Sequence, residues 1–438
     1  MTLLAALAEF IADTASQDIP EAVRDHAHKA FVNWLGVASH AARTAAGAPF
    51  LALAEAAGAG LVPVVGGGRA PEAAAALVNG ALAHLDDFDD THLATVTHPS
   101  TPVIAAAWAA CRPESDWNAW LEAIAVGTEV VIRVAELLSP SHYDRGWHIT
   151  ASVGGIGAAA AVSRLWRLDR KETTQALALA ALQPVGLRAA FGTHGKAFQV
   201  GRAAEIGWTA AQAARLGVTA PEDVLEHRRG LRITSDDFHA QVIGQAGRPW
   251  AFLDDTFKPY PSGIVTHPAI DAAIALHAQL DPSAIRQVEA AVHPLVVELT
   301  GIRAPKTGLE VKFSATGLIA LGLVRGQVAP EDFELPLDPL SRTVESQVNL
   351  LADHTLGRDS ATLTVRLQDG SVRTHHVEHA RGSVASPLSW GDLERKFLAC
   401  WKEDQRDQAG AAWSWAREKA LPPSALRYHF GANPASLG

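Results

Sequence analysis

The stretch PEAVRDHAHKAFVNW, residues 20–34, decides the class of fold. Proline suits the start of a helix because it has no N–H to donate there and its φ is already helical. Apolar residues then follow at intervals of three and four, at Val23, Ala27, Ala30, Phe31 and Trp34. This spacing predicts an amphipathic helix that buries one face in a core.

The same spacing continues from Leu3 to about Ser283, with Gly and Pro marking the turns. We expect further helices near residues 71–86, 101–111, 118–138, 151–166, 171–182 and 198–215. Thr219 followed by Glu222 has the pattern of a capping box and predicts one more helix start.

After about Asp281 the pattern changes. The segments IRQVEAAVHP (285–294) and VNLLADHT (348–355) are short, and ATLTVRLQDGSVRTHHVEHA (361–380) alternates with period two. Asp369-Gly370 at the centre of that last segment predicts a hairpin with a type I′ turn. Ser389 with Asp392 predicts a helix over 390–401.

The 438 residues exceed what one core usually organises, so two domains are expected. The predicted fold class is mainly α, with a large all-helical domain over 1–265 and a smaller α+β domain over 266–401. A C-terminal helix over 402–438 is expected to join the first domain.

Composition narrows the function. The net charge of −10 and the lack of a Lys/Arg run argue against a nucleic-acid partner. The longest apolar runs fall well short of the about 20 residues that cross a membrane, and the N-terminus has no basic region of the kind that opens a secretory signal. Cys111 and Cys400 show no CxxC spacing. A cytoplasmic protein without a membrane or nucleic-acid partner is therefore expected.

The segment HLDDFDDTHLATVTHPS (84–100) concentrates four aspartates and three histidines where a helix pattern gives way to a loop. Neighbouring carboxylates move each other's pKa values apart, and a carboxylate can hold a histidine in one tautomer, as proton transfer near neutral pH requires. We select Asp87, Thr91 and His98 as catalytic candidates. For Asp86, Asp89 and His92 a role in capping helices or ordering the loop is the preferred interpretation.

Two further segments carry candidates. In HYDRGWHITASVGGIGAAAA (142–161), Tyr143 and His148 precede a helix rich in small residues. In FGTHGKAFQVGRAAEIG (191–207), Lys196 and Arg202 are the only cations of an otherwise weakly charged stretch, which suits the binding of a substrate carboxylate.

A fourth segment, FKPYPSGIVTHPAID (257–271), offers Lys258 and His267 where the helical half meets the second domain. Domain junctions are common ligand sites, so these two residues are candidates for binding substrate.

These segments, with EVKFS at 310–314, resemble in order and in wording the signature stretches of the MmgE/PrpD family of dehydratases, decarboxylases and epimerases, over nearly the whole chain. The resemblance implies that the α+β domain over 266–401 is a lid, with the active site between it and the helical domain. It also implies a homodimer that works without metal, nucleotide or iron–sulfur cofactor. Carried over residue by residue, it assigns catalysis to Asp87, Thr91, His98, His148 and Lys196 and substrate binding to Lys258, with Tyr143, Arg202, His267 and Lys312 as further binding candidates.

Two positions depart from the pattern of the decarboxylase-like members. The resemblance implies a tyrosine shortly after the KFS motif and a histidine shortly after the KPYP motif, but this chain has Gly317 and Gly263 there. A different substrate or outcome is therefore expected, and Tyr143 is the nearest candidate for a replacement phenol.

The resemblance implies a lyase, a dehydratase or decarboxylase, that removes a proton next to a carboxylate of a small di- or tricarboxylic acid, with His98 or His148 as the base. An epimerase of a dicarboxylic acid such as iminodisuccinate, and a non-catalytic relative that binds an acid or acts as a scaffold, stay open. Of the less favoured alternatives, DDFDD (86–90) has the spacing with which isoprenoid synthases hold magnesium. A metal site of His84, His92 and His98 matches no compact ligand motif.

Overall fold

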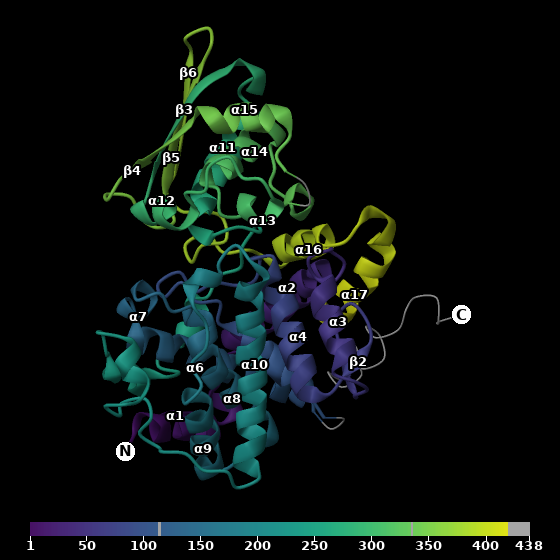
Figure 1. Cartoon of the computed structure of the whole chain (residues 1–438), viewed down its shortest axis with the longest axis vertical. Coiled ribbons are helices and arrows are strands. Elements are labelled where there is room, and N and C mark those ends of the chain that lie inside the picture. The colour runs from purple at the N-terminus through teal and green to yellow at the C-terminus, as the bar shows by residue number, and fades with distance from the viewer. Residues whose placement is uncertain (113–114, 334–335, 419–438) are drawn as a thin grey trace. The chain divides into compact units, whose positions relative to one another are not determined.

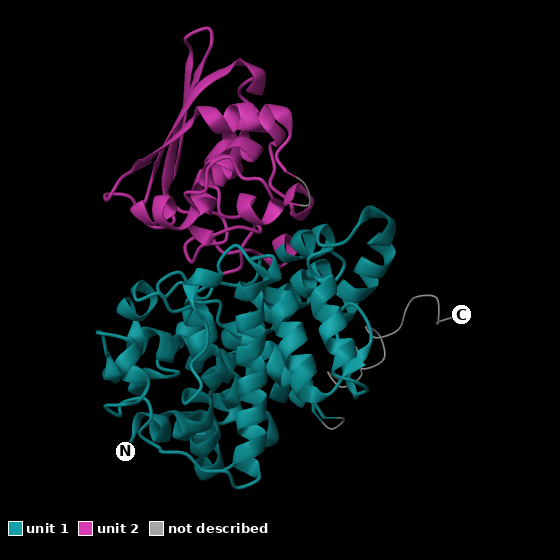
Figure 2. Cartoon of the chain, viewed as in Figure 1, with its two compact units in different colours: residues 1–255, 393–438 teal, residues 256–392 magenta. Residues whose placement is uncertain are grey.

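In the computed structural model, which describes residues 1–112, 115–333 and 336–418, the chain divides into two units (Figure 2). The first comprises residues 1–255 and 393–438, and the second comprises residues 256–392. No helix of the described chain is long and apolar enough to span a bilayer.

The first unit is built almost entirely from helices (Figure 1). They are α1 Leu3–Asp13, α2 Glu21–Ala41, α3 Ala48–Ala56, α4 Glu72–Leu85, α5 Ser100–Ala110, α6 Trp117–Leu138, α7 Ser141–Asp144, α8 Ile149–Trp166, α9 Arg170–Ala181, α10 His194–Arg215, α16 Trp390–Ala399 and α17 Arg406–Glu418. A short antiparallel pair, β1 Val62–Pro63 with β2 Arg69–Ala70, corrects the expectation that this domain is wholly helical.

The predicted helices are confirmed to within a few residues, apart from α10, which begins four residues before the predicted start at 198. The predicted helix at Thr219–Glu222 is wrong, because residues 222–230 form turns. There the side chain of Gln175 accepts a hydrogen bond from the N–H of Ala220 at 2.6 Å, which satisfies the backbone without a helix. Of the expected helix over 402–438, α17 is described, and residues 419–438 lie outside the described part.

Glycines bring the long helices together. A Cβ atom on Gly201 of α10 would lie 2.2 Å from the carbonyl oxygen of Leu77 in α4, and one on Gly80 would lie 3.2 Å from the Cα of Gly201. Since real side chains never approach a backbone oxygen so closely, α4 and α10 pack backbone to backbone here. On another side α10 packs against α8, which runs beside it in Figure 1.

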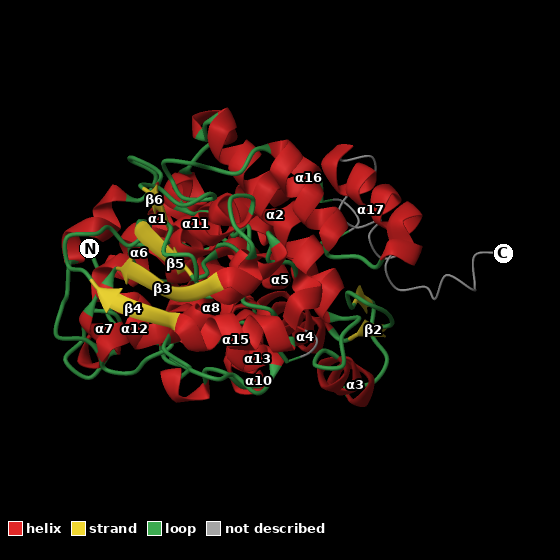
Figure 3. Cartoon of the chain, turned by 90° about the horizontal axis from the view of Figure 1, so that it is seen from above, coloured by secondary structure: helices red, strands yellow, loops and turns green. Residues whose placement is uncertain are grey.

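The second unit combines a mixed sheet with helices (Figure 3). Its elements are α11 His267–His277, β3 Ile285–Val292, α12 Pro294–Thr300, α13 Gly308–Val311, α14 Ala315–Arg325, α15 Pro339–Gln347, β4 Val348–Ala352, β5 Ala361–Leu367 and β6 Val372–Val377. The strand order is β4-β3-β5-β6, with β3 parallel to β4 and antiparallel to β5. Every second residue of β5 is buried, as one covered face requires.

The predicted hairpin forms between β5 and β6, but its turn differs from the predicted type I′. Gly370 has a φ of +86°, whereas Asp369 does not have positive φ. The N–H of Gly370 donates to the carbonyl of Leu367, and the N–H of Leu367 donates to the carbonyl of Ser371. This is a three-residue loop with glycine in the left-handed position, for which the sequence Asp-Gly is equally suitable.

The boundary between the units lies at 255/256, ten residues before the predicted 265/266. Residues 257–263 join the second unit through contacts such as the hydrogen bond from the N–H of Gly263 to the carbonyl of Lys312. At the other end, α16 begins with the predicted reciprocal bonds between Ser389 and Asp392. From Leu393 onward it belongs to the first unit.

Candidate active site

The acidic loop between α4 and α5 shows what the cluster at 84–100 becomes in three dimensions. α4 ends at Leu85, and Asp87 takes a left-handed backbone conformation with a φ of +52°. Residues other than glycine rarely adopt this conformation. It turns the backbone sharply after the helix, and the carboxylates on either side of it have different partners.

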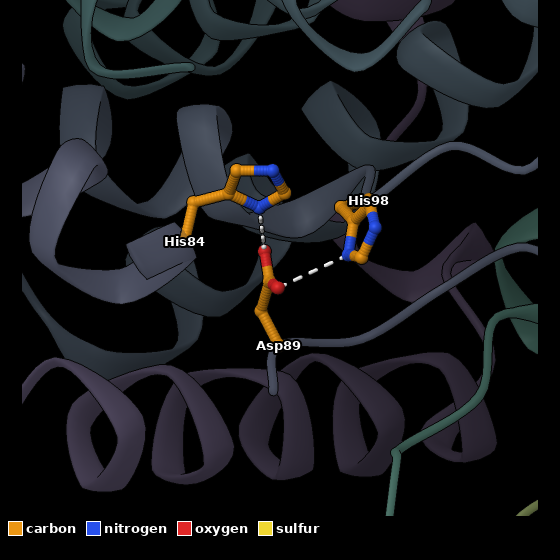
Figure 4. A group of neighbouring side chains, drawn as sticks. All are labelled: His84, Asp89 and His98. Carbon is orange, nitrogen blue, oxygen red and sulfur yellow. Dashed lines mark hydrogen bonds and ion pairs between the residues drawn. The ribbon is translucent and has the colours of Figure 1, made fainter. Parts of the chain in front are cut away.

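Asp89 lies between two imidazole rings (Figure 4). Its Oδ2 accepts a hydrogen bond from Nδ1 of His84 at 2.8 Å, and its Oδ1 lies 3.0 Å from Nδ1 of His98. The hydroxyl of Thr101 also donates to Oδ2, at 2.7 Å. The carboxylate therefore fixes the orientation of both rings, which meet edge to face with centroids 4.6 Å apart.

Charge and burial oppose each other at Asp89. Burial raises the pKa of its carboxyl, but the neighbouring His84 and His98 outweigh burial and hold the pKa well below its usual range. Burial also lowers the pKa of His84 to about 4, although Asp89 opposes this shift. The consistent state is an ionised carboxylate that accepts an N–H bond from the neutral imidazole of His84 and faces the ring of His98.

Asp87 connects this group to the cation at the start of α10. Its Oδ1 forms a short ion pair with the ammonium of Lys196, and the same oxygen lies 3.4 Å from Nε2 of His98. Lys196 sits in the first turn of α10, 5.4 Å above the ring of Phe191. A buried ammonium with a carboxylate partner is suited to a second anion, such as a substrate carboxylate.

His148 lies at the N-terminal end of α8, stacked on His84 with ring centroids 5.5 Å apart. Its Nδ1 lies 3.0 Å from the amide oxygen of Gln199, and its Nε2 is buried without a hydrogen-bond partner among the described residues. Phe191 covers the ring edge to face at 5.1 Å, so the Phe191 ring neighbours both His148 and Lys196.

The tautomer of His148 follows from these contacts. Burial, with the nearby His84 and Lys196, holds its pKa well below the usual value, so the ring is neutral at pH 7. Because an amide oxygen can only accept, Nδ1 carries the proton and donates to Gln199. Nε2 is then unprotonated, and its lone pair accepts no hydrogen bond from a described residue. A general base needs such a lone pair.

Threonines complete the group. The hydroxyl of Thr91 lies 3.4 Å from Nδ1 of His98, and the hydroxyl of Thr150 in α8 accepts from the backbone N–H of His98 at 3.0 Å. The second bond attaches the acidic loop directly to the helix that carries His148.

The five predicted catalytic residues Asp87, Thr91, His98, His148 and Lys196 thus belong to one connected group in the first unit. Two predicted binding residues of that unit have other partners. Arg202 forms an ion pair with Glu205 one turn along α10. Tyr143 lies in α7 with the guanidinium of Arg188 4.0 Å above its ring.

The remaining candidates lie in the second unit. The ammonium of Lys258 donates to the carbonyl of Ser262 at 3.1 Å, and the ring of His267 meets that of Tyr260 edge to face. Lys312 lies 5.5 Å above the ring of Phe333. The backbone bond between Gly263 and Lys312 links the segment of Lys258 to that of Lys312.

The DDFDD motif does not gather its carboxylates around one point. Asp86 bonds His40 at 2.7 Å, Asp87 pairs with Lys196, and Asp89 serves His84 and His98. Asp90 accepts from the hydroxyl and the N–H of Ser100. Carboxylates engaged with separate protein groups are unlike the magnesium-binding aspartates of an isoprenoid synthase, which converge on the ions.

The potential metal ligands that do gather are His84, Asp89 and His98, with ligand atoms within 4.8 Å of one another. His92 is not in this group, and its Nδ1 instead bonds the hydroxyl of Thr95. Both Nδ1 atoms that would bind an ion are directed at oxygens of the one carboxylate, which also accepts from Thr101. The arrangement of these three side chains is therefore that of a carboxylate held between two imidazoles and a hydroxyl, and not that of ligands directed at a shared ion.

Sequence reasoning left out three residues of this group. The sequence favours capping or loop order for Asp89, suggests His84 only as a metal ligand, and gives no motif for Gln199. Gln199 lies three residues after Lys196, which puts both on one face of α10, but the predicted helix begins only at 198 and so did not include Lys196.

Comparison with known proteins identifies the family. Residues 5–240 match the family described as the MmgE/PrpD N-terminal domain, and residues 260–416 match the MmgE/PrpD C-terminal domain. Among curated proteins, the cis-aconitate decarboxylase of Homo sapiens is 29% identical over 355 residues, covering 76% of this chain and 73% of the relative.

Two other relatives bear the same name. The cis-aconitate decarboxylase of Mus musculus is 28% identical, covering 76% of this chain and 72% of its own length. That of Aspergillus terreus is 30% identical over 165 residues, which are 36% of this chain and 34% of the relative.

Proposed function

The chain belongs to the MmgE/PrpD family, and on that premise we propose that it is a cofactor-independent lyase, a dehydratase or decarboxylase of a small di- or tricarboxylic acid. The observation that carries the proposal is the buried Nε2 of His148, which has no hydrogen-bond partner among the described residues and belongs to a neutral imidazole. The names of the relatives support the substrate class.

In the proposed reaction Nε2 of His148 takes the proton from the carbon next to a carboxylate. The electron pair of the broken C–H bond moves into that carboxylate, and the ammonium of Lys196 stabilises the charge as it develops. In a dehydration this pair then expels a β-hydroxyl group. In a decarboxylation no C–H bond is broken. The pair comes from the C–C bond that breaks as carbon dioxide leaves, and the carbon takes up a proton from protonated His98.

Asp87 and Asp89 prepare the other groups. Asp87 holds the ammonium of Lys196 and faces Nε2 of His98, while Asp89 holds Nδ1 of His98. His98 is thereby placed to deliver or accept a second proton, as loss of hydroxide requires.

A second candidate is an epimerase of a dicarboxylic acid, in which the carbanion is reprotonated on its other face. It is favoured by Gly263 and Gly317, the positions where the family resemblance implies a histidine and a tyrosine. A Cβ on Gly317 would lie 3.0 Å from the hydroxyl of Ser314, and one on Gly263 would lie 3.0 Å from Thr300. The space beside both glycines is therefore too tight for a larger side chain unless these neighbours shift.

The test is a panel of di- and tricarboxylic acids incubated with the enzyme in heavy water. Proton NMR reports deuterium entering the α-carbon, loss of a hydroxyl group and loss of a carboxylate, while optical rotation reports epimerisation. His148→Ala should lower exchange by about 10²–10⁴-fold with an unchanged circular dichroism spectrum. His227→Ala is the matched control, because His227 is exposed and outside the group.

Binding of these acids without exchange would instead support a non-catalytic relative. Wild-type exchange in His148→Ala would remove His148 from the role of base.

A further inference from the structure

A buried lysine from the far end of the chain contacts the acidic loop. Lys396 of α16 is 7% exposed, and its ammonium donates to the carbonyl of Phe88 at 2.7 Å. It also lies 3.7 Å above the ring of the same residue. Lysine is rarely buried unless its charge is compensated. The burial of Lys396 therefore indicates that its ammonium has a specific role at this position.

The contact point lies between two carboxylates of the candidate site. The carbonyl of Phe88 belongs to the peptide that joins Phe88 to Asp89, and Asp87 is the residue before it. Asp87 has its unfavourable φ of +52°, which persists only where the surroundings impose it. A bond to the next carbonyl restrains the chain on both sides of that conformation.

The lysine is itself anchored. Its ammonium donates to the amide oxygen of Asn33 in α2 at 2.6 Å. The next residue, Phe397, is 2% exposed and packs on Gly36, where an added Cβ would lie 2.9 Å from the ring. The close packing of α16 on α2 thus fixes the direction in which Lys396 points.

We infer that Lys396 is a positioning residue, which sets the direction of the Asp87 and Asp89 carboxylates by holding the peptide between them. The inference rests on the proposed function for its kinetic consequence. The ammonium acts through three contacts that a neutral side chain of equal length cannot make together: two oxygens and the face of a ring.

Lys396→Met keeps an unbranched apolar stem that is one atom shorter and removes the ammonium. If the lysine positions Asp87, kcat should fall by about 10²-fold, because a small misplacement of reacting groups has that effect, while KM changes little. Lys402→Met, at an exposed lysine of the same segment, is the matched control and should match the wild type. Asn33→Ser releases the anchor, retains the ammonium, and should lower kcat by less than Lys396→Met.

A second readout separates this inference from the proposed function. The imidazole signals of His84 and His98 in a two-dimensional NMR spectrum report the position of Asp89 whether or not any acid is turned over. They should shift in Lys396→Met and Asn33→Ser and stay in place in Lys402→Met. Folded Lys396→Met with wild-type kcat and unshifted signals overturns the inference, and should that variant not fold, the same result in Asn33→Ser does so.

If no acid of the panel is turned over by the wild type, the proposed function fails. The histidine signals then decide the positioning role alone.

Discussion

The amide oxygen of Gln199 lies 3.0 Å from Nδ1 of His148 and decides which nitrogen of that ring carries the proton. Both residues face each other from different helices, His148 at the start of α8 and Gln199 in the second turn of α10. The base therefore depends on a neutral partner that has no part in proton transfer itself.

Replacing Gln199 by leucine should remove this control. Without the acceptor, the ring can place its proton on Nε2, where it blocks the lone pair. We expect kcat to fall by about 10-fold to 10²-fold, less than the about 10²–10⁴-fold for loss of the base itself, with a smaller change in KM. Gln183→Leu, at an exposed glutamine outside the group, is the control. Equal kcat values for the two variants would show that Gln199 does not set the tautomer.

Asp89→Asn should lower kcat by about 10²–10⁴-fold, as loss of the carboxylate that orients a catalytic histidine does elsewhere. The amide has one oxygen to accept with, whereas the carboxylate accepts from His84 and Thr101 and faces His98. Steady-state kinetics measure the effect, and Asp18→Asn, at an exposed aspartate, controls for the loss of a charge. Retention of more than half of the wild-type kcat would contradict the role of Asp89.

Stability should fall as the pH drops from about 6.5 to about 4. Burial is the largest cause that lowers the pKa values of His26, His84, His92 and His142, each to about 4. In this window the unfolded chain binds protons at these histidines and the folded chain does not, so acid favours unfolding. Each such histidine adds up to about 1.4 kcal/mol per pH unit to the slope.

Urea unfolding at several pH values measures this slope. His142→Gln is an informative variant, because glutamine can bond Thr234 and Ser152, the present partners of His142, without titrating. Its slope should be lower than that of the wild type, and an unchanged slope would show that His142 does not contribute.

Removal of metal ions should leave turnover unchanged. His84, Asp89 and His98 are close enough to hold an ion, but their facing atoms already contact one another. Dialysis against a chelator followed by assay in metal-free buffer tests this, and added Zn²⁺ should inhibit because it competes for the same nitrogen atoms. Activity lost with the chelator and regained with one particular ion would establish a metal enzyme.

The helices and the hairpin could be predicted because their signals are local. Apolar spacing defines α2, and Asp369-Gly370 defines the reversal between β5 and β6. The turn type could not be predicted, since Asp-Gly fits two loop lengths equally well. Nor could the missing helix at Thr219, where the partner of the backbone comes from Gln175, 45 residues away.

In the candidate site, too, some residues have a local signal in the sequence and others do not. The motifs indicated Asp87, His98 and His148 because their neighbourhood is chemically dense. The role of Asp89 depends on which of the four carboxylates in residues 86–90 turns toward the two rings. This follows from the path of the backbone, which is left-handed at Asp87. Period and composition carry no information about such a turn, which a non-glycine residue adopts only when its surroundings force it.

The contact between Gly80 and Gly201 has a consequence for how this scaffold can diversify. Asp87 follows α4 and Lys196 opens α10, so the separation of the two charges is set where the helices touch without side chains. A larger residue at Gly201 would force the two backbones apart, because its Cβ would lie 2.2 Å from the carbonyl oxygen of Leu77. New specificities are therefore more easily acquired by exchanging residues that line the substrate than by altering the frame that spaces its charges.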